Sequence, residues 1–244
     1  MTSRGGRLDG RIALITGASR GIGAAVAKAF AAEGAETILV ARTQGGLEEV
    51  DDAIRALGGA ATLFPADLTD FAMIDEMALT INERFGRLDI LVANAGILGP
   101  LSPMHHIDPD QWDAVMTINL TANWRLVRAF DPLLRLSPAG RAIFMTSGAS
   151  DGRHPYWGPY AVSKGALEVM ARTWASEIEE TNMAVNLFNP GGTATAMRAE
   201  AFPGEDPDTL PSADEVAQAL IPLAEAGCRL NGEIINARDT VGGT

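Results

Sequence analysis

Three side chains between residues 147 and 164 are suited to acid–base chemistry. Ser147 supplies a hydroxyl, Tyr160 a phenol and Lys164 an ammonium. If a helix begins near Gly158, Tyr160 and Lys164 stand on one face, about 5–6 Å apart at their Cβ atoms. A neighbouring cation favours the phenolate and lowers the pKa of tyrosine from its usual value near ~10 towards neutral pH. The pattern is suited to proton transfer. The alternative interpretation is a solvated surface pair.

A glycine-rich turn follows the first predicted strand and opens a predicted helix. Glycines allow a tight turn, and the N–H groups at a helix N-terminus then face a phosphate. A position between a strand and a helix of the first βαβ unit is the context that a dinucleotide-binding turn requires. The turn reads T-G-A-S-R-G-I-G, and its predicted cofactor-binding residues are Gly17, Ser19, Arg20, Gly21, Ile22 and Gly23.

The end of the second predicted strand indicates which dinucleotide is bound. An acid there would bind a free ribose 2′-hydroxyl, but this chain has Ala41 followed by Arg42 and Thr43. Arg42, together with Arg20, can pair with a 2′-phosphate, and Thr43 can add a hydroxyl. We therefore predict NADP(H) in preference to NAD(H). The alternative is that both arginines are ordinary surface charges.

The composition limits the other classes of function. Of 244 residues, 47% are hydrophobic and 20% charged, which is typical of a globular protein. The net charge of −12 argues against a nucleic-acid surface. No apolar run resembles a membrane helix or a signal peptide. Cys228 is the only cysteine, and the adjacent His105 and His106 are expected in a solvated loop. We expect a cytoplasmic protein without nucleic-acid, membrane or metal partners.

Short apolar runs alternate with longer amphipathic segments, which predicts βαβ units on a parallel sheet. The strands are expected at Ile12–Thr16, Thr37–Ala41, Ala61–Pro65, Ile90–Ala93, Ala142–Thr146, Ala184–Phe188 and Glu233–Asn236. The helices are expected at Ile22–Glu33, Gly46–Leu57, Phe71–Phe85, Pro109–Arg135, Gly158–Glu180 and Ala213–Ala226. Helix N-caps are expected at Asp108 and Ser212.

No repeat, low-complexity tract or linker marks a second domain. We predict an α/β fold in one doubly wound Rossmann-fold domain over 1–244, with a seven-stranded, mainly parallel sheet and helices on both faces. Residues 1–9 are expected to be a flexible N-terminus. The long irregular stretch 191–211 follows the carboxyl end of a strand, where open α/β sheets bind ligands. We interpret it as a substrate lid, with a merely mobile loop as the alternative.

Several motifs in register resemble the short-chain dehydrogenase/reductase family from Leu8 to the last strand. The motifs are T-G-x-x-x-G-x-G from Thr16, Asp67 after the third strand, Asn94-Ala95-Gly96 after the fourth, the helix residue Asn119, Ser147 thirteen residues before Tyr160, and Pro190-Gly191 with Thr195. The resemblance implies an NAD(P)(H)-dependent oxidoreductase that transfers a hydride between NADP(H) and a carbonyl or alcohol. It adds the cofactor-binding residues Asp67, Leu68, Asn94, Ala95, Gly96, Tyr160, Lys164, Pro190, Gly191, Thr193 and Thr195.

The resemblance also implies a role for each catalytic residue. Tyr160 would exchange a proton with the substrate oxygen, which Ser147 would bind. Lys164 would hold the nicotinamide ribose and lower the pKa of Tyr160, and Asn119 would hold a water linking Lys164 to solvent. The alternatives are a strand-end cap for Ser147, a helix bend for Asn119 and a turn former for Thr195.

The sequence says less about the substrate. Ala93 replaces a common family asparagine, and the C-terminal run 231–244 departs from the commoner V-D-G-G ending. We expect a mainly apolar pocket with few charges, which favours a neutral ketone or aldehyde. The expected pocket residues are Ser147, Ala149, His154, Tyr156, Trp157, 98–101, Met197 and Phe202. The lid acids Glu200, Glu205, Asp206 and Asp208 would repel an anion unless they face outward.

The resemblance implies a homodimer or homotetramer that pairs through the two long helices. Trp124, Met170 and Trp174 are candidate anchors there, and core packing is the alternative. Three other functions stay open: a cofactor-sensing binding protein with the same fold and no turnover, an NAD-dependent alcohol dehydrogenase, and a scaffold protein.

Overall fold

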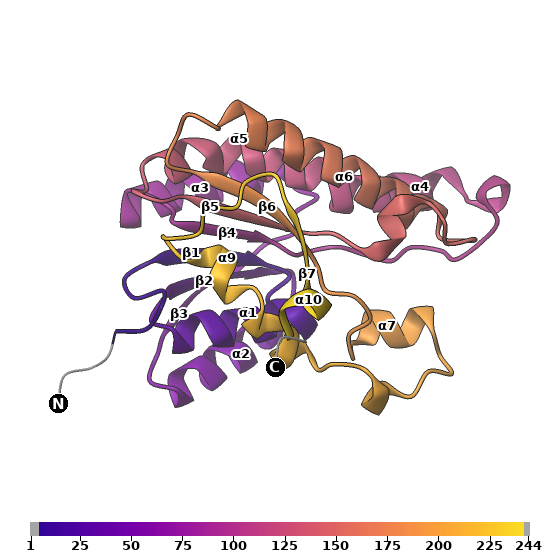
Figure 1. Cartoon of the computed structure of the whole chain (residues 1–244), viewed down its shortest axis with the longest axis horizontal. Helices are drawn as coiled ribbons and strands as arrows, with labels where there is room; N and C mark the ends of the chain where they lie inside the picture. Colours follow the sequence, from indigo (N-terminus) through magenta and orange to yellow (C-terminus); the bar gives the residue numbers. More distant parts are fainter. Residues whose placement is uncertain (1–4, 242–244) are drawn as a thin grey trace.

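The computed structural model describes residues 5–241, which form one seven-stranded sheet between two layers of helices (Figure 1). The strands are β1 (Ile12–Thr16), β2 (Glu36–Ala41), β3 (Ala61–Pro65), β4 (Ile90–Ala93), β5 (Arg141–Met145), β6 (Ala184–Asn189) and β7 (Ile234–Asn236). Their order across the sheet is β3-β2-β1-β4-β5-β6-β7, and every neighbouring pair is parallel. The predicted doubly wound α/β fold is confirmed.

Each face of the sheet carries its own apolar core because successive strand side chains point to opposite faces. Ile15 of β1 packs with Phe30 on one face, and Leu14 packs with Phe130 on the other. The first face is covered by α1 (Gly21–Ala32), α2 (Gln44–Ala56), α8 (Ala213–Gln218) and α9 (Ile221–Ala224). The second face is covered by α3 (Phe71–Phe85), α5 (Ala122–Arg135) and α6 (Gly158–Glu177).

Two predicted helices are each divided in the structure. The helix expected over 109–135 consists of α4 (Pro109–Met116), a π-helical turn at Thr117–Thr121 and α5. The helix expected over 213–226 ends at Gln218 and resumes as α9. Pro222 lies four residues after Gln218 and has no N–H to donate to its carbonyl. The remaining helix and strand boundaries differ from the predictions by three residues or fewer.

Helix ends confirm one predicted cap and contradict another. Ser212 and Glu215 form the expected capping box at the start of α8. Asp108 precedes α4 without a side-chain capping bond, and Pro109 at the first helical position leaves one N–H group fewer to be satisfied at this end. The stretch 191–211 is not wholly irregular, because it contains α7 (Ala196–Ala201) and a 3₁₀ turn at Pro207–Thr209. Thr195 caps α7 by accepting a hydrogen bond from the Arg198 N–H.

The segment expected to be flexible, 1–9, has one buried residue, Leu8, where the structure describes it. Residues 1–4 lie outside the described residues. Leu8 is fully buried, and its N–H donates to the Glu33 carbonyl at 2.9 Å. Leu8 therefore anchors the end of this segment to the first core, and the flexibility of the segment stays a prediction.

The tryptophans of the two long helices differ in exposure. Trp174 is 4% exposed, packs edge-on against Phe144 and donates its indole N–H to Asp131, so it belongs to the core. Trp124 is 46% exposed and stays available to a partner, whereas Met170 packs partly against the second core. The described helices include none with the length and apolar character that crossing a bilayer requires.

Candidate active site

The glycine turn after β1 is packed so closely that side chains would not fit. A Cβ on Gly17 would lie 2.9 Å from the Asn94 amide nitrogen, and one on Gly23 would lie 2.3 Å from the Gly17 carbonyl oxygen. Gly17 and Gly21 also have positive φ angles of 65° and 56°, which favour glycine. The turn leads directly from the carboxyl end of β1 into the N-terminus of α1, as the predicted phosphate-binding turn requires.

Thr16 connects this turn to the loop after β4. Its hydroxyl oxygen accepts hydrogen bonds from the Asn94 and Ala95 N–H groups, both at 3.0 Å. The Asn94 side-chain amide donates to the Thr16 carbonyl at 2.9 Å. Strands β1 and β4 are neighbours where the strand order reverses, which is the point at which such sheets bind ligands. The sequence motif contains Thr16, but its bridging role was not predicted.

The predicted 2′-phosphate pair, Arg20 and Arg42, lies on the surface at this edge. Both side chains are exposed, and among residues 5–241 neither forms an ion pair. The pKa of Asp67 is lowered chiefly by a hydrogen bond from the Thr69 backbone, with a smaller contribution from the Arg42 charge. Thr43 is exposed beside Arg42, whereas the predicted cofactor residue Leu68 has its side chain in the core.

The π-helical turn places Asn119 in the interior. Asn119 is fully buried, and its side-chain amide accepts from the Ile97 N–H and donates to the Ile97 carbonyl, both at 2.9 Å. The same amide nitrogen donates to the Ser163 hydroxyl at 3.1 Å. Single π turns in α-helices are frequent at functional sites. Both amide hydrogens are therefore bound by protein, and the side chain fixes the loop after Gly96 against α6.

Lys164 lies one helical turn after Tyr160 and is buried. Its ammonium donates to the Met145 carbonyl at 2.6 Å and lies 5.7 Å from the centroid of the Tyr160 ring. Burial lowers the pKa of Lys164 to about 8, because a charged amine is poorly solvated away from water. The predicted proximity of the phenol and the cation is confirmed.

The direction of the Tyr160 pKa differs from the prediction. Burial raises the pKa of the phenol, and a hydrogen bond with Ser147 opposes the rise in part. The predicted lowering by Lys164 is wrong for this structure, because loss of water around the phenolate outweighs any charge effect. Ser147 also accepts from the Ala149 N–H at 3.2 Å, so it caps the short helix after β5 as well as contacting Tyr160.

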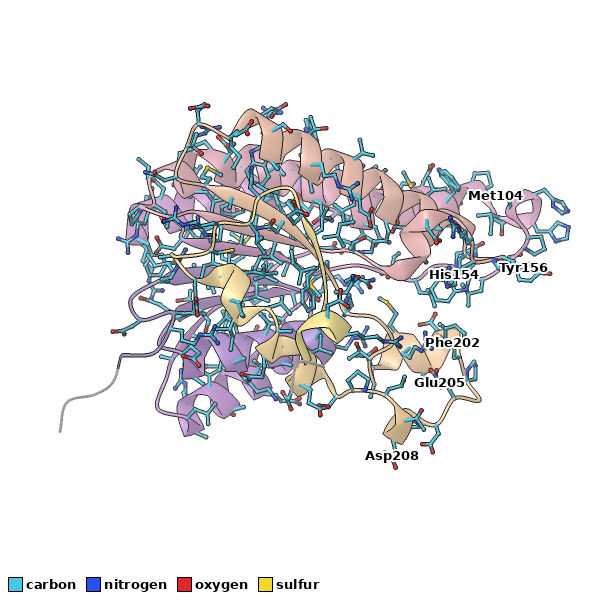
Figure 2. All side chains as sticks on the ribbon, in the orientation of Figure 1. Met104, His154, Tyr156, Phe202, Glu205 and Asp208 are labelled. Atoms are coloured by element: carbon cyan, nitrogen blue, oxygen red, sulfur yellow. The ribbon has the colours of Figure 1, made fainter. Side chains whose placement is uncertain are left out.

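A cavity of about 380 Å³ opens in front of Ser147. Five of the predicted substrate residues line it: Ser147, Ala149, His154, Trp157 and Phe202. Met197 packs instead against the cluster of Leu98, Ala149 and Tyr160. The predicted liners 98–101 and Tyr156 are not among its lining residues. Tyr156 is 60% exposed and points outward from the end of its loop (Figure 2).

The cavity is more polar than the sequence suggests. Its additional lining residues include Asn189, Arg198, Asn236, Arg238 and Asp239. The prediction of a mainly apolar pocket with few charges is therefore wrong. Asn189 and Asn236 end β6 and β7, and the carboxyl ends of neighbouring parallel strands meet at one edge. That rule would have placed both asparagines at the site.

The four acids of the predicted lid do not gather at the cavity. Glu205 forms two hydrogen bonds with Arg198, and Asp206 accepts from the Asp208 N–H. Asp208 projects from the outer edge of the lid, away from the cavity (Figure 2). The predicted repulsion of an anionic substrate by these carboxylates is therefore weak.

The other predicted cofactor residues lie along the same edge. Pro190 and Gly191 follow β6, and Thr193 is buried with its hydroxyl directed to the Pro190 carbonyl at 3.3 Å. The Thr195 methyl group would contact a Cβ on Gly21 at 3.6 Å, so the P-G-x-x-x-T run adjoins the glycine turn. Within residues 5–241, His, Cys, Asp and Glu side chains form no group of three or more that could hold a metal. His105 and His106 are exposed in a 3₁₀ turn.

Residues 11–206 match the short chain dehydrogenase family. The chain is 40% identical over 206 residues to the uncharacterised oxidoreductase YciK of Escherichia coli K12, covering 83% of this chain and 81% of that protein. It resembles a short chain dehydrogenase of Shigella flexneri solved with NADP, with a TM-score of 0.92, 37% identity and coverage of 96% and 100%. A short chain dehydrogenase of Escherichia coli CFT073 solved with NADPH gives a TM-score of 0.92, 37% identity and coverage of 96% and 99%.

The fold, the site and these similarities agree. The chain belongs to the short chain dehydrogenase family, and it is an oxidoreductase.

The buried Lys164 predicts a pH-dependent stability. Its pKa is about 8 in the folded protein, against about 10.5 for a solvated lysine. Between these values the unfolded chain binds more protons, so the free energy of unfolding rises with pH, by at most about 1.4 kcal/mol per unit for one proton. Urea unfolding from pH 7.5 to 9.5 measures this slope, which Lys164→Met should remove.

The control is Lys28→Met, because Lys28 is the only other lysine and pairs with Asp214 at the surface. This variant should keep the slope of the unsubstituted protein. An equal slope in Lys164→Met and the unsubstituted protein would show that Lys164 titrates as a solvated amine and would contradict the prediction.

Proposed function

We propose that this protein transfers a hydride between NADP(H) and the carbonyl or carbinol carbon of a small molecule, with Tyr160 as the general acid and base. The observation that carries the proposal is the convergence of Ser147, Tyr160 and Lys164. The hydroxyl and the phenol are hydrogen-bonded, and the phenol lies beside a buried ammonium. The cavity that opens in front of Ser147 offers room for a substrate.

The residues present fit a bound dinucleotide. The close packing at Gly17 and Gly23 leaves backbone N–H groups at the start of α1 to face phosphate oxygens. Arg20 and Arg42 are exposed cations at the same edge, suited to a 2′-phosphate. The relatives solved with NADP and NADPH support this choice of cofactor. When bound, NADPH supplies the hydride for carbonyl reduction.

Tyr160 provides the proton in this proposal. Its raised pKa keeps the phenol protonated at neutral pH, which is the form needed to protonate a carbonyl oxygen during reduction. Ser147 donates a second hydrogen bond to the same oxygen and fixes the position of the carbonyl. The Lys164 ammonium then stabilises the phenolate that remains, because an opposite charge nearby favours the ionised form.

Asn119 acts as a positioning residue. Its amide binds Ile97 and Ser163 and so holds the loop after β4 against α6 at the residue that precedes Lys164. A Cβ on Gly96 would lie 3.1 Å from the Asn119 side-chain oxygen and 3.8 Å from the Lys164 nitrogen, which shows how closely the three residues pack. This oxygen accepts from Ile97 and retains a second lone pair, which is where a water linking Lys164 to solvent would bind.

We propose a homodimer or homotetramer in the cytoplasm as the assembly and location. Trp124, on α5, and Val169, on α6, are 46% and 65% exposed. Apolar side chains of this size on two long helices suit an interface between subunits. Cys228 as the only cysteine suits a reducing compartment.

Replacing Tyr160 with phenylalanine should abolish turnover while NADPH still binds. The substitution removes the proton donor and keeps the ring that packs against Trp157. We expect the rate of carbonyl-dependent NADPH oxidation to fall by at least about a thousandfold, measured with a panel of ketones and aldehydes. Tyr156→Phe is the matched control, because Tyr156 is the only other tyrosine and lies outside the cavity.

The same assay separates this function from its alternatives. A Tyr160→Phe variant with near-normal turnover would refute the proposed mechanism. Binding of NADPH without oxidation by any carbonyl compound would favour a cofactor-sensing binding protein. Failure to bind any nicotinamide cofactor would favour a scaffold protein.

Replacing Arg42 with alanine should weaken the binding of NADPH and not that of NADH. Loss of one charge-assisted contact to a 2′-phosphate should raise the KM for NADPH roughly tenfold or more and leave the KM for NADH nearly unchanged. Arg84→Ala is the control, because Arg84 is an exposed arginine on α3 whose ion pair with Glu36 spans 3.7 Å. A preference of the unsubstituted protein for NADH would support an NAD-dependent alcohol dehydrogenase instead.

A further inference from the structure

The two arginines that line the cavity differ in their surroundings. Arg198 binds Glu205 through two hydrogen bonds, at 2.5 and 2.7 Å, and its guanidinium carbon lies 3.8 Å from the centroid of the Phe202 ring. Glu205 therefore neutralises its charge, and the pair with Phe202 stiffens the lid. Arg198 is accordingly a poor candidate for binding a charged substrate.

Arg238 has no such partner within residues 5–241. It lies in α10 (Ala237–Val241), directly after β7, and among the described residues it forms no ion pair with a carboxylate. Its Nε lies 3.6 Å from the position that a Cβ on Gly191 would occupy, so the guanidinium is directed across the loop after β6. The same side chain lines the cavity that Ser147 and Trp157 line.

A chain of amide hydrogen bonds holds the segment that carries Arg238. The Asn189 side chain accepts from the Gly191 N–H and donates to the Asn236 side-chain oxygen at 3.0 Å. Asn236 in turn donates to the Asp239 carboxylate at 2.9 Å. These contacts join the end of β6 to the start of α10, the helix whose exposed Arg238 side chain lines the cavity. The Asp239 carboxylate is thus bound by the neutral amide of Asn236.

We propose that Arg238 binds a carboxylate of the substrate, so that the protein reduces oxo acids and, in the reverse direction, oxidises hydroxy acids. This inference rests on the proposed function. A single guanidinium without a carboxylate partner matches a single negative charge, and its planar fork suits a carboxylate. A phosphate with two negative charges would be repelled more strongly than a carboxylate by Asp239, which lines the same cavity. The rings of Trp157 and Phe202 supply apolar contacts for the carbon chain.

A bound cofactor explains the position of Arg238 less well than a substrate carboxylate does. None of the residues from Gly17 to Gly23 lines this cavity. The family resemblance implies that the neighbouring Pro190-Gly191 turn, with Thr195, contacts the nicotinamide carboxamide of the cofactor, which is neutral. A guanidinium between that turn and the cavity is therefore placed to meet an anionic group of a substrate bound in the cavity.

The test uses three oxo acids with their methyl esters as matched neutral probes: pyruvate, levulinate and 4-acetylbenzoate. Binding to the full chain loaded with NADP⁺ is measured by titration calorimetry, and turnover is measured with NADPH. At least one acid should bind about tenfold or more tightly than its ester. Arg238→Gln should weaken binding of that acid roughly 10- to 100-fold and leave the ester unchanged. Arg238→Lys keeps the positive charge, so its affinity for that acid should lie between those of the unsubstituted protein and Arg238→Gln.

The control is Arg229→Gln, which removes the same charge from an exposed arginine outside the cavity and should change neither probe. Thermal melting and the Kd for NADPH should stay the same in Arg238→Gln. Equal binding of acids and esters, or a preference for acids that Arg238→Gln retains, would overturn the inference. So would an effect of Arg238→Gln confined to NADPH.

The two proposals fail in distinguishable ways. If the esters are reduced in a Tyr160-dependent reaction and the acids are not preferred, this inference is wrong and the proposed function stands. If an acid binds through Arg238 and no probe is oxidised or reduced, the carboxylate site stands and the proposed function is in doubt.

Discussion

Burial of the Lys164 amine constrains the residues around it. Its Nζ donates to the Met145 carbonyl, which joins α6 to the end of β5. Little else replaces the lost water, and the pKa of the amine therefore falls to about 8. A phenolate at Tyr160 would supply the missing opposite charge. The packing of α6 thus places the Lys164 ammonium beside the phenol whose ionised form it favours. Gly96 and Asn119 pack so closely at the ammonium that a Cβ on Gly96 would lie 3.8 Å from its nitrogen.

The fold and the chemistry-bearing residues could be predicted because their signals are local. The apolar runs of the strands and the glycine turn before α1 each lie within a few neighbouring residues. Motifs in register then identified the residues that meet at the carboxyl edge, and Asn119 is an example. The break between α4 and α5 was considered only as an alternative, a helix bend at Asn119, because residues 117–121 show a helical pattern and the π turn depends on tertiary contacts of Asn119.

The chemistry of the cavity could not be predicted from local patterns. Asn189 and Asn236 lie 47 residues apart and meet because β6 and β7 are paired. Whether Arg198 or Arg238 keeps its charge available depends on the fold of the lid, where Glu205 pairs with one of them. The pKa of Tyr160 was predicted in the wrong direction, since the sequence gives the neighbouring cation but not the depth of burial. Tyr156 was placed in the pocket because it lies near Tyr160 in the sequence.

In the proposed reaction a hydride passes directly between NADP(H) and a carbonyl carbon, with Tyr160 as the general acid and base. The most direct measurement uses NADPH deuterated at both positions of nicotinamide C4, with a reducible carbonyl compound and mass spectrometry of the product. Direct hydride transfer predicts an alcohol with one deuterium on the former carbonyl carbon, and no such product from Tyr160→Phe. Product formed without deuterium, or labelled equally by the variant, would contradict it.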